Sequence, residues 1–390
     1  MTKKDDKKKL QSGSTIAELT TMILQAMHTY DELDDQAFQE IIADIINQSD
    51  KYHKLPLEEK RQLAITLFNR MRRLDILQPL MDNEQITEIM VNGPNKIFFE
   101  QNGQLYPSDL QFESAESLSQ LILHFFSSAN RPLNEACPIA DLRLPDGSRA
   151  NAVLPPIAPD GPIFTIRKFT GIRPDIQTLI RSGFISSDAA QYLSSAVRER
   201  KTIFLCGGTG SGKTTFLNVL SSFIPKTERV VTIEDSAELS LQGITNLVRL
   251  ESRLPGPDGH GGVDIGQLIR TALRMRPDRI VVGEVRGSEA ADMLHALHTG
   301  HPGSLCTGHA NSCLEMLERL VTMVMAGSTL PYDAVIRQIT MGVDILVHIT
   351  RGKSGQRYID EISEVCPIQD NRFHIRQRYQ YKEANGLEAC

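Results

Sequence analysis

The sequence of 390 residues contains no tryptophan, and only 6% of its residues are aromatic. It also lacks an uninterrupted apolar run near the roughly 20 residues that a membrane-spanning helix needs, so no such helix is predicted. The first ten residues are rich in lysine and do not contain the apolar segment of a signal peptide. We therefore expect a solvated basic tail at this end.

The sequence shows no excess of positive charge. Its formal net charge is −6 and its isoelectric point is about 6.0, so no global basic field draws the protein to nucleic acid. Hydrophobic residues make up 41% and charged residues 23% of the chain. That composition is typical of a globular protein with enough apolar material for more than one core.

Cysteine is sparse, and its spacing excludes the common zinc motifs. The six cysteines form no Cys-x-x-Cys pair, which argues against a zinc ribbon. They are Cys137, Cys206, Cys306, Cys313, Cys366 and Cys390. Scattered cysteines of this kind are typical of reduced thiols in the cytoplasm, where most act as small buried hydrophobic side chains.

Three hydrophobic patterns follow one another along the chain, and they predict three domains. Residues 1–80 combine the basic tail with three amphipathic stripes, which indicate a small helical bundle. Residues 81–168 contain apolar runs punctuated by Asn92-Gly93 and Asn102-Gly103, which is typical of strands in a smaller α+β domain. In residues 169–390 helices alternate with short apolar strands, which predicts an α/β domain with a parallel-rich sheet covered by helices.

The strongest motif is a phosphate-binding loop in the third domain. Gly207–Thr214 matches the pattern G-x-x-x-x-G-K-[ST] and stands between an apolar strand and a helical run. Glycines let backbone N–H groups curl around a phosphate, and the helix N-terminus adds a fixed positive end. Lys213 supplies a cation for the β- and γ-phosphates, and Thr214 supplies a hydroxyl for Mg²⁺. The predicted nucleotide-binding residues are Gly207, Gly208, Thr209, Gly210, Ser211, Gly212, Lys213, Thr214 and Thr215.

Two further apolar strands end in carboxylates, as hydrolysis of a nucleotide requires. Val230–Ile233 runs into the acidic segment Glu234–Glu238, and Ile280–Val282 runs into Gly283-Glu284. Polar residues at the carboxyl ends of strands are where open α/β sheets bind ligands. The usual Walker B strand ends in aspartate near the position of Gly283, so Glu284 is expected to activate water. The sequence leaves open which acidic segment supplies the base.

ATP is the expected nucleotide. The guanine-reading pattern Asn-Lys-x-Asp is absent, because Asn95-Lys96 is followed by Ile97-Phe98. We therefore predict ATP and Mg²⁺ as the cofactors.

Four of the ten histidines fall between His295 and His309. A metal site is one interpretation, but no acidic or cysteine ligands stand at a recognisable zinc spacing. We favour a polar strand end near the γ-phosphate, with structural roles for His295 and His298.

Arginines are frequent on both sides of the phosphate-binding loop. In a ring-shaped NTPase a few of them must reach a neighbour's γ-phosphate, because guanidinium stabilises spread phosphoryl charge. The arginines that we consider are Arg143, Arg149, Arg167, Arg270, Arg274, Arg276 and Arg286.

With these motifs in order, the chain from about Asp82 to Val365 resembles the type II/type IV secretion ATPases. It is most similar to the CpaF-type ATPases of tight-adherence (Flp) pilus assembly. The family's Walker A, Asp box, Walker B with glycine before glutamate, and His box all have counterparts here. The segments that carry the resemblance are Thr87–Gly93, Gly207–Thr214, Ile233–Leu239, Arg274–Gly287 and Thr299–Ser312.

The resemblance implies a homo-hexameric ring of two-domain subunits, with the nucleotide between an N-terminal domain and a RecA-like P-loop domain. It implies that Glu284 is the catalytic glutamate and that Glu238 is a second essential acid, which we expect to bind the metal. It places the His-box histidine at His309. The family's N-terminal arginines correspond to Arg143, Arg149 and Arg167.

One position departs from the family pattern. Gly308 stands before His309 where an isoleucine or leucine is expected. We expect the glycine to loosen the strand.

The resemblance also implies partners and a location. The partners would be inner-membrane platform proteins that move pilin subunits, with the ATPase cytoplasmic and peripheral at the inner membrane. Two alternatives stay open: a conjugation-type secretion ATPase that exports proteins, and a ring that translocates nucleic acid. Weak basicity and the lack of an aromatic stacking run argue against the second, so no nucleic acid is expected. The sequence does not distinguish pilus extension from retraction.

Overall fold

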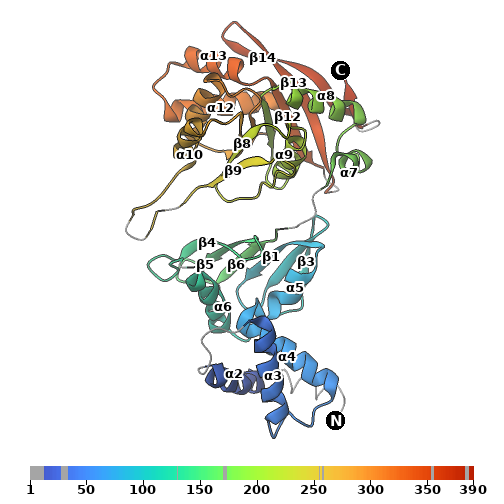
Figure 1. Cartoon of the computed structure of the whole chain (residues 1–390), viewed down its shortest axis with the longest axis vertical. Helices are drawn as coiled ribbons and strands as arrows, with labels where there is room; N and C mark the ends of the chain where they lie inside the picture. Colours follow the sequence, from blue (N-terminus) through green and yellow to red (C-terminus); the bar gives the residue numbers. More distant parts are fainter. Residues whose placement is uncertain are drawn as a thin grey trace. The chain divides into compact units, whose positions relative to one another are not determined.

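In the computed structural model the chain divides into two compact units, Met1–Thr170 and Gly171–Cys390, which are described separately (Figure 1). The basic tail expected in the first ten residues lies outside the described residues. None of the described helices is both long enough and apolar enough to cross a membrane. The residues that the structure describes are 13–27, 34–129, 131–169, 174–253, 255–256, 259–352, 355–382 and 386–390.

The N-terminal unit begins with a helical bundle that has its own hydrophobic cluster. Phe38 and Ile42 pack in this cluster with Ile23 and Leu67, all of them fully buried. The Asp34 side chain accepts a hydrogen bond of 2.7 Å from the N–H of Ala37 and so caps the second helix. The helices are α2 (Gly13–Met27), α3 (Asp35–Gln48), α4 (Leu57–Arg72), η1 (Asp75–Leu77) and α5 (Gln78–Asp82).

A six-stranded antiparallel sheet completes this unit. Its order is β3-β2-β1-β6-β5-β4, and α6 (Ala115–Ser128) packs on one face. Asn102 and Gly103 both have positive φ, 51° and 77°, which fits the two-residue hairpin turn expected between β2 and β3. The strands are β1 (Ile86–Asn92), β2 (Ile97–Gln101), β3 (Gln104–Ser108), β4 (Ile139–Arg143), β5 (Arg149–Val153) and β6 (Ile163–Arg167).

The C-terminal unit is built on a nine-stranded sheet of order β15-β14-β13-β12-β7-β11-β10-β8-β9. From β12 to β9 every neighbouring pair is parallel, and β13, β14 and β15 extend the sheet antiparallel. The predicted α/β fold with a parallel-rich sheet is therefore confirmed. The strands are β7 (Ile203–Gly207), β8 (Arg229–Glu234), β9 (Asn246–Glu251), β10 (Arg279–Val285), β11 (Leu305–Gly308), β12 (Ile345–Arg351), β13 (Arg357–Gln369), β14 (Arg372–Lys382) and β15 (Gly386–Ala389).

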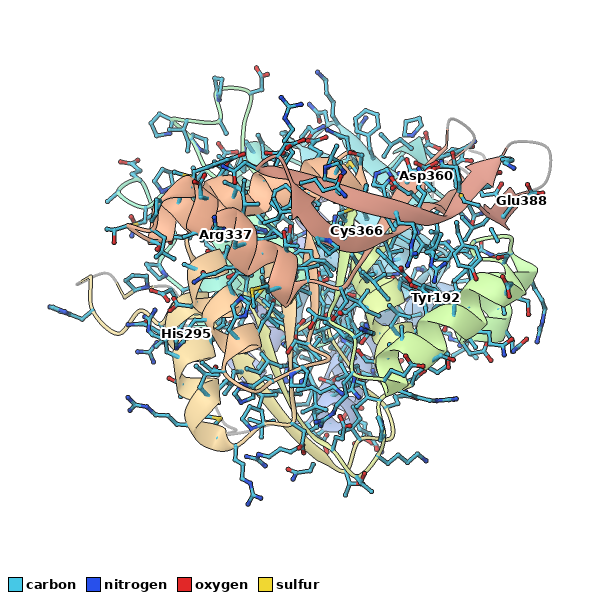
Figure 2. All side chains as sticks on the ribbon, turned by 90° about the horizontal axis from the view of Figure 1, so that it is seen from above. Tyr192, His295, Arg337, Asp360, Cys366 and Glu388 are labelled. Carbon is cyan, nitrogen blue, oxygen red and sulfur yellow. The ribbon has the colours of Figure 1, made fainter. Side chains whose placement is uncertain are left out.

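Helices cover both faces of this sheet. Residues of β7 alternate between two hydrophobic clusters: Phe204 belongs to the cluster with α10–α13, and Leu205 to the cluster with α7–α9. Figure 2 shows Tyr192 of α8 and His295 of α11 on opposite sides of this sheet. The helices are α7 (Ile176–Arg181), α8 (Ser187–Arg198), α9 (Lys213–Ser221), α10 (Ile265–Ala272), η2 (Leu273–Met275), α11 (Glu289–His298), α12 (Cys313–Gly327) and α13 (Tyr332–Gly342).

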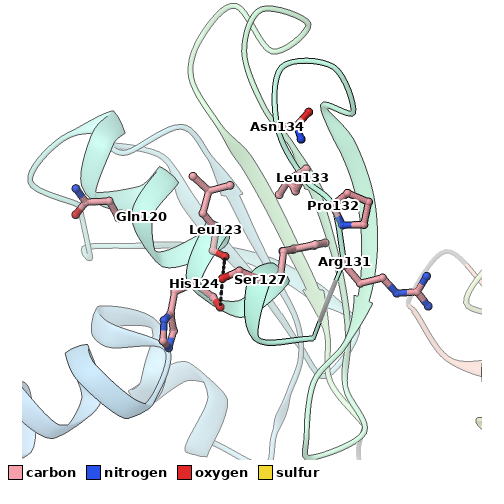
Figure 3. A pocket seen from close by; sticks show the side chains of 9 residues that line it. Gln120, Leu123, His124, Ser127, Arg131, Pro132, Leu133 and Asn134 are labelled. Atoms are coloured by element: carbon pink, nitrogen blue, oxygen red, sulfur yellow. Dashed lines mark hydrogen bonds between the residues drawn. The ribbon is translucent and has the colours of Figure 1, made fainter. Parts of the chain in front are cut away.

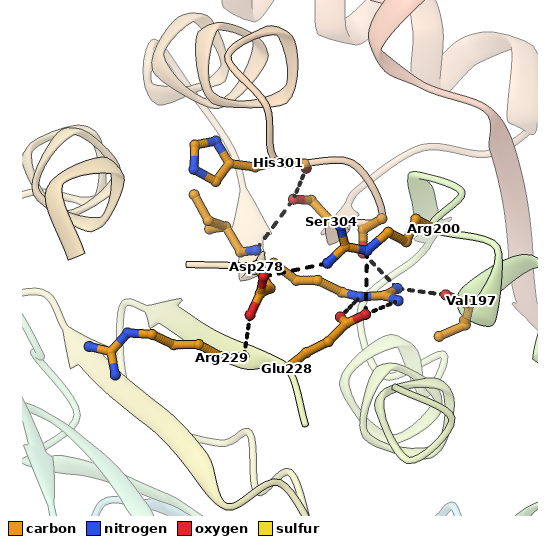
Figure 4. Close-up of polar contacts among 10 residues, drawn as sticks. Val197, Arg200, Glu228, Arg229, Asp278, His301 and Ser304 are labelled. Atoms are coloured by element: carbon orange, nitrogen blue, oxygen red, sulfur yellow. Dashed lines mark hydrogen bonds and ion pairs between the residues drawn. The ribbon is translucent and has the colours of Figure 1, made fainter. Parts of the chain in front are cut away.

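A buried arginine at the start of β10 contacts the last turn of α8 and the residues that precede β8 and β11; Figure 4 labels its partners Val197 and Glu228. Arg279, the first residue of β10, has no exposed side-chain surface, and its guanidinium forms a two-point ion pair with Glu228. It also donates hydrogen bonds to the carbonyl oxygens of Val197 at 2.6 Å and Gly303 at 3.3 Å. Arg200 pairs with the same glutamate at 3.3 Å. We refer to Arg279, Glu228 and Arg200 as the Arg279 cluster.

Candidate active site

The phosphate-binding loop connects the carboxyl end of β7 to the start of α9. Gly207, the last residue of β7, has φ 153°, and a Cβ atom there would lie 2.1 Å from the carbonyl oxygen of Ile349 in β12. The neighbouring strand therefore requires glycine at this position. Gly212, with φ 101°, precedes α9 and aims the first N–H groups of the helix at the loop.

Lys213 is buried within this loop. Its Nζ donates hydrogen bonds to the carbonyl oxygens of Gly207 at 3.0 Å and Gly208 at 2.9 Å. The Oγ of Ser211 is buried and has no hydrogen-bond partner within the described part of the chain. A buried hydroxyl and a buried ammonium beside a helix N-terminus form a cradle that fits phosphate oxygens.

Glu284, in β10, contacts two partners. Its Oε2 accepts a hydrogen bond of 2.5 Å from Nη2 of Arg286, and its Oε1 lies 2.5 Å from Nε2 of His309 without the alignment of a hydrogen bond. Burial alone would raise the pKa of Glu284. The hydrogen bond and charge of Arg286, with His309 and Lys213, outweigh burial and hold the pKa below its ordinary value. Glu284 is therefore an anion at neutral pH.

His309 follows β11 and stands between opposite charges. Its Nδ1 lies 3.5 Å from Nζ of Lys213. Burial, and then the charge of Lys213, lower the pKa of the imidazole, although Glu284 acts in the opposite direction. The ring is therefore neutral at pH 7, where it can accept a hydrogen bond from the ammonium.

The segment after β8 supplies the second acidic group. Glu234 is buried, and its Oε1 accepts hydrogen bonds from the N–H groups of Glu238 at 2.8 Å and Leu239 at 2.7 Å. Burial raises the pKa of Glu234 above its ordinary value, and these N–H groups offset only part of that shift. Asp235 comes within 3.6 Å of Arg286. A continuous set of contacts thus runs from Lys213 through His309, Glu284 and Arg286 to Asp235.

The three arginines predicted to be catalytic form one row in the N-terminal unit. Arg143 is opposite Arg149 in the sheet register, Arg149 is opposite Arg167, and Arg167 is opposite Glu88. Directly opposite residues share a face of a sheet. The strand residues next to these arginines in sequence, Leu142, Ala150 and Ile166, point to the other face and are buried in the cluster with α6. The arginine row therefore occupies the face that α6 leaves uncovered.

The histidine-rich stretch is divided between the two ends of β11, and one expectation from the sequence, that Gly308 loosens the strand, is wrong. His301 precedes β11 and is hydrogen-bonded to the carbonyl oxygen of Ala296 at the end of the strand away from the loop, so of this stretch only His309 reaches the site. His298 contacts the carbonyl oxygen of Gln338 at 2.9 Å. Gly308 does not loosen the strand: it is buried in β11, and a Cβ there would lie 2.8 Å from Cε of Met316. A side chain at this position would require the Met316 thioether of α12 to shift.

Sequence reasoning did not single out three residues that the structure places at the site, Glu234, Asp235 and Arg357, and it named Arg286 only as one of several arginines that could reach a neighbour's γ-phosphate. Arg286 lies directly after β10, two residues beyond Glu284, and its guanidinium folds back onto that carboxylate. Glu234 and Asp235 belong to the acidic segment already recognised. Arg357 had no local signal, yet its Nε donates a hydrogen bond of 2.8 Å to the carbonyl oxygen of Gly210.

The residues present fit a nucleotide with Mg²⁺. Among the described residues no three His, Cys, Asp or Glu side chains cluster as a metal site. Mg²⁺ commonly uses one or two carboxylates together with substrate phosphates and water, so such a cluster is not required. The Thr214 hydroxyl and the Glu238 carboxylate remain the groups that the sequence predicts to hold it. Thr215, the third residue of α9, is exposed.

A pocket in the N-terminal unit does not offer comparable chemistry (Figure 3). The residues that line it belong to α6 and the segment after it, and none is acidic. The hydroxyl of Ser127 is already hydrogen-bonded to the carbonyl oxygens of Leu123 and His124. The loop around Lys213 is therefore the candidate active site.

Comparisons with known proteins agree with this geometry. The family described as Type II/IV secretion system protein matches residues 71–390. A Mycobacterium tuberculosis protein named for conjugal transfer is 36% identical over 74% of this chain and 83% of its own length. The type IV secretion system protein VirB11 of Brucella suis is 32% identical over 74% of this chain and 88% of its own.

Solved structures of low sequence identity share the fold. The ATPase DotB of Legionella pneumophila is 22% identical, with a TM-score of 0.53 over 74% of this chain and 79% of that chain. The pilus retraction motor PilT with bound ADP is 16% identical, with a TM-score of 0.50 over 78% of this chain and 81% of that chain.

Proposed function

The chain belongs to the type II/IV secretion system protein family, and from this premise we propose that it is an ATPase that powers pilus assembly or protein secretion across the bacterial inner membrane. The observation that carries the proposal is the set of contacts that joins Lys213, His309, Glu284, Arg286 and Asp235. These residues lie in or just after the carboxyl ends of four strands, β7, β11, β10 and β8. All of them lie at the carboxyl end of the parallel sheet, where a bound nucleotide meets the protein.

The chemistry of each group follows from its contacts. Lys213 and the first N–H groups of α9 bind the phosphates, and Mg²⁺, when bound, neutralises charge on their oxygens. Glu284 is anionic, and its carboxylate can accept a hydrogen bond from the attacking water and orient it. Arg286 and His309 hold that carboxylate from two directions. Catalysis of this kind depends mainly on positioning and fixed charge.

We further propose a homo-hexamer in which Arg143, Arg149 and Arg167 of one subunit complete the site of a neighbour. Three guanidinium groups in a row on the sheet face opposite α6 suit the stabilisation of phosphoryl charge. The ring would be cytoplasmic and would bind inner-membrane platform proteins that move pilin. The finer assignment is a CpaF-type ATPase of Flp pilus assembly.

A conjugation-type secretion ATPase is the second candidate. It is favoured by the relative named for conjugal transfer and by VirB11 of a type IV secretion system. Cytoplasmic loops of the two kinds of membrane partner distinguish the candidates. Stimulation of the ATPase rate by the loop of a pilus platform protein would favour pilus assembly, and stimulation by the loop of a conjugation-type partner would favour the second candidate. Stimulation by DNA alone would contradict both functions.

Lys213→Ala tests the site. It should lower ATP hydrolysis by about 10²- to 10³-fold, because the developing phosphoryl charge loses its fixed cation. Lys201→Ala is the matched control: Lys201 pairs with Asp344 before β7, and its removal should leave the rate unchanged. Wild-type turnover in Lys213→Ala would contradict the proposed site.

Mixing two inactive variants tests the ring. Arg149→Ala should lose about 10³-fold or more in rate if its guanidinium acts as an arginine finger. Mixed with Lys213→Ala, it should regain part of the activity, because some interfaces then combine an intact loop with an intact arginine. No recovery in verified mixed rings would mean that Arg149 does not act on a neighbouring subunit.

A further inference from the structure

Gly283 occupies the place where a usual Walker B strand ends in aspartate, and the structure shows what fills the space beside it. A Cβ atom at Gly283 would lie 2.9 Å from Cγ and 3.5 Å from Cβ of Glu234. Strands β8 and β10 are parallel neighbours, with Ile233 opposite Val282 in the register. The side chain of Glu234 therefore crosses from the adjacent strand and covers Gly283.

The same side chain anchors the acidic loop. Only 3% of Glu234 is exposed, and its Oε1 accepts both the Glu238 and the Leu239 N–H groups. Its Oε2 is buried and has no hydrogen-bond partner in the described ranges. Hydrogen bonds to a carboxylate are stronger than those between neutral groups, so they fix the direction of the loop at Glu238.

The loop and Glu284 are linked through Arg286. Asp235, the residue after Glu234, lies 3.6 Å from Arg286, which in turn holds Glu284. A shift of Glu234 would thus move the acidic loop and the support of Glu284 together. Glycine at 283 is the residue that lets Glu234 remain in place.

We propose that Glu234 is a positioning residue for hydrolysis. Its carboxylate fixes the conformation of the loop that carries Glu238, and its side chain requires glycine at position 283. The proposal rests on the proposed ATPase function. It assigns a role to the glycine before Glu284: the absent side chain makes room for a carboxylate that comes from the neighbouring strand.

A double-mutant cycle tests the pair. Gly283→Ala should lower kcat by about 10- to 100-fold, the usual effect of a lost charge-assisted hydrogen bond, because the new methyl group displaces Glu234. Glu234→Ala should lower kcat to a similar degree. The double variant should be no slower than Glu234→Ala alone, because the clash has gone with the side chain. If the fold-losses in kcat of the two single variants multiply in the double variant, the proposal is overturned.

Two controls separate positioning from general destabilisation. Gly342→Ala adds the same methyl group in α13 at ordinary contact distances of 3.5 Å, and it should keep the wild-type kcat. Glu234→Gln preserves the volume beside Gly283 and an oxygen acceptor for the loop, so it should retain most of the activity lost in Glu234→Ala. A glutamine variant as slow as the alanine variant would show that the charge acts directly, which contradicts a positioning role.

Binding measurements distinguish this proposal from the proposed function. Glu234→Ala and Gly283→Ala should bind ADP without metal as tightly as wild type, and Mg²⁺ should strengthen that binding less than in wild type. This comparison does not need turnover. A wild-type protein that binds Mg²⁺-ADP but does not hydrolyse ATP would defeat the ATPase proposal alone. Unchanged Mg²⁺ dependence in both variants would defeat the role of Glu234 alone.

Discussion

Lys213 and His309 face each other across the phosphate-binding loop, with the ammonium Nζ 3.5 Å from the imidazole Nδ1. The other ring nitrogen, Nε2, lies 2.5 Å from Oε1 of Glu284. The imidazole therefore separates the cation that meets the phosphates from the carboxylate that is expected to orient water. A neutral ring suits this place, since a protonated one would repel Lys213.

The first prediction concerns the pH dependence that His309 imposes. Burial and Lys213 keep the pKa of His309 below its ordinary 6.5, so protonation should reduce kcat only below pH 6.5. The acid limb of Glu284 should lie lower still, below pH 4.5. His309→Asn should lose up to about 100-fold in kcat through misplacement of Glu284. A kcat–pH profile measures both acid limbs. A His309→Asn variant that still loses activity between pH 6.5 and pH 4.5 would contradict the assignment of that limb to His309.

The second prediction separates the two acids. Glu284→Gln keeps the shape of the side chain but removes its charge, so it should bind ATP as wild type does and lose about 10²- to 10⁴-fold in hydrolysis. Glu238→Gln should instead show an altered Mg²⁺ dependence, partly relieved by Mn²⁺. Steady-state rates and nucleotide affinities at graded metal concentrations measure the difference. If the two variants respond equally to the metal, the separate roles of Glu284 and Glu238 are contradicted. If Glu284→Gln turns over at nearly the wild-type rate, Glu238 is the general base instead.

The motifs of this site could be predicted from the sequence because each is local. The loop from Gly207 to Thr214 needs a strand before it and a helix after it, and all three are contiguous. The acidic ends of β8 and β10 are equally visible, because parallel strands bring their carboxyl ends to one edge. His309 and Glu284 could be selected for the same reason.

Contacts between strands could not be predicted in the same way. That Glu234 covers Gly283 depends on the register of β8 against β10, which no local pattern specifies. The row of Arg143, Arg149 and Arg167 likewise depends on three strands paired in one register. His301 and His309 are close in sequence, but β11 runs between them and carries them to opposite ends of the sheet.

The third prediction concerns the buried ion pair of Arg279 and Glu228. Arg279→Met should lower the free energy of unfolding by about 3 kcal/mol, because Glu228 then keeps only Arg200 as a partner and the carbonyl oxygens of Val197 and Gly303 lose their donor. Arg279→Met/Glu228→Met should recover part of this loss, since both charges are then absent. Chemical unfolding of the two variants measures the difference. A double variant less stable than Arg279→Met would contradict this account of the pair.

The fourth prediction concerns Glu364 in β13. It accepts hydrogen bonds of 2.8 Å from Tyr192 and Arg378 and a further one from Arg376. Burial alone would raise the pKa of Glu364, but these partners outweigh burial and lower it from 4.5 to about 2. Glu364→Gln should therefore lower stability by about 1–2 kcal/mol at pH 7, discounted for the exposed arginines.

The pH dependence of this effect has a fixed sign. A depressed carboxyl pKa stabilises the folded state above pH 4.5, and this contribution is lost as the pH falls from 4.5 toward 2. Thermal unfolding midpoints of wild type and Glu364→Gln should therefore converge over that range. Glu388→Gln, in an exposed pair with Lys382, is the control and should change the midpoint little at any pH. A gap that widens on acidification would contradict the prediction.

The Arg279 cluster stabilises the amino end of β10, opposite to the carboxyl end that carries Glu284. Hydrogen bonds to Val197 and Gly303 tie α8 and the turn before β11 to the first residue of β10. Amide protons there should exchange with solvent only when the whole unit unfolds, whereas those of the loop after Glu234 should exchange through local opening. Any displacement that a nucleotide causes is therefore expected in the loops at the carboxyl ends of the strands, while the strands themselves stay in place.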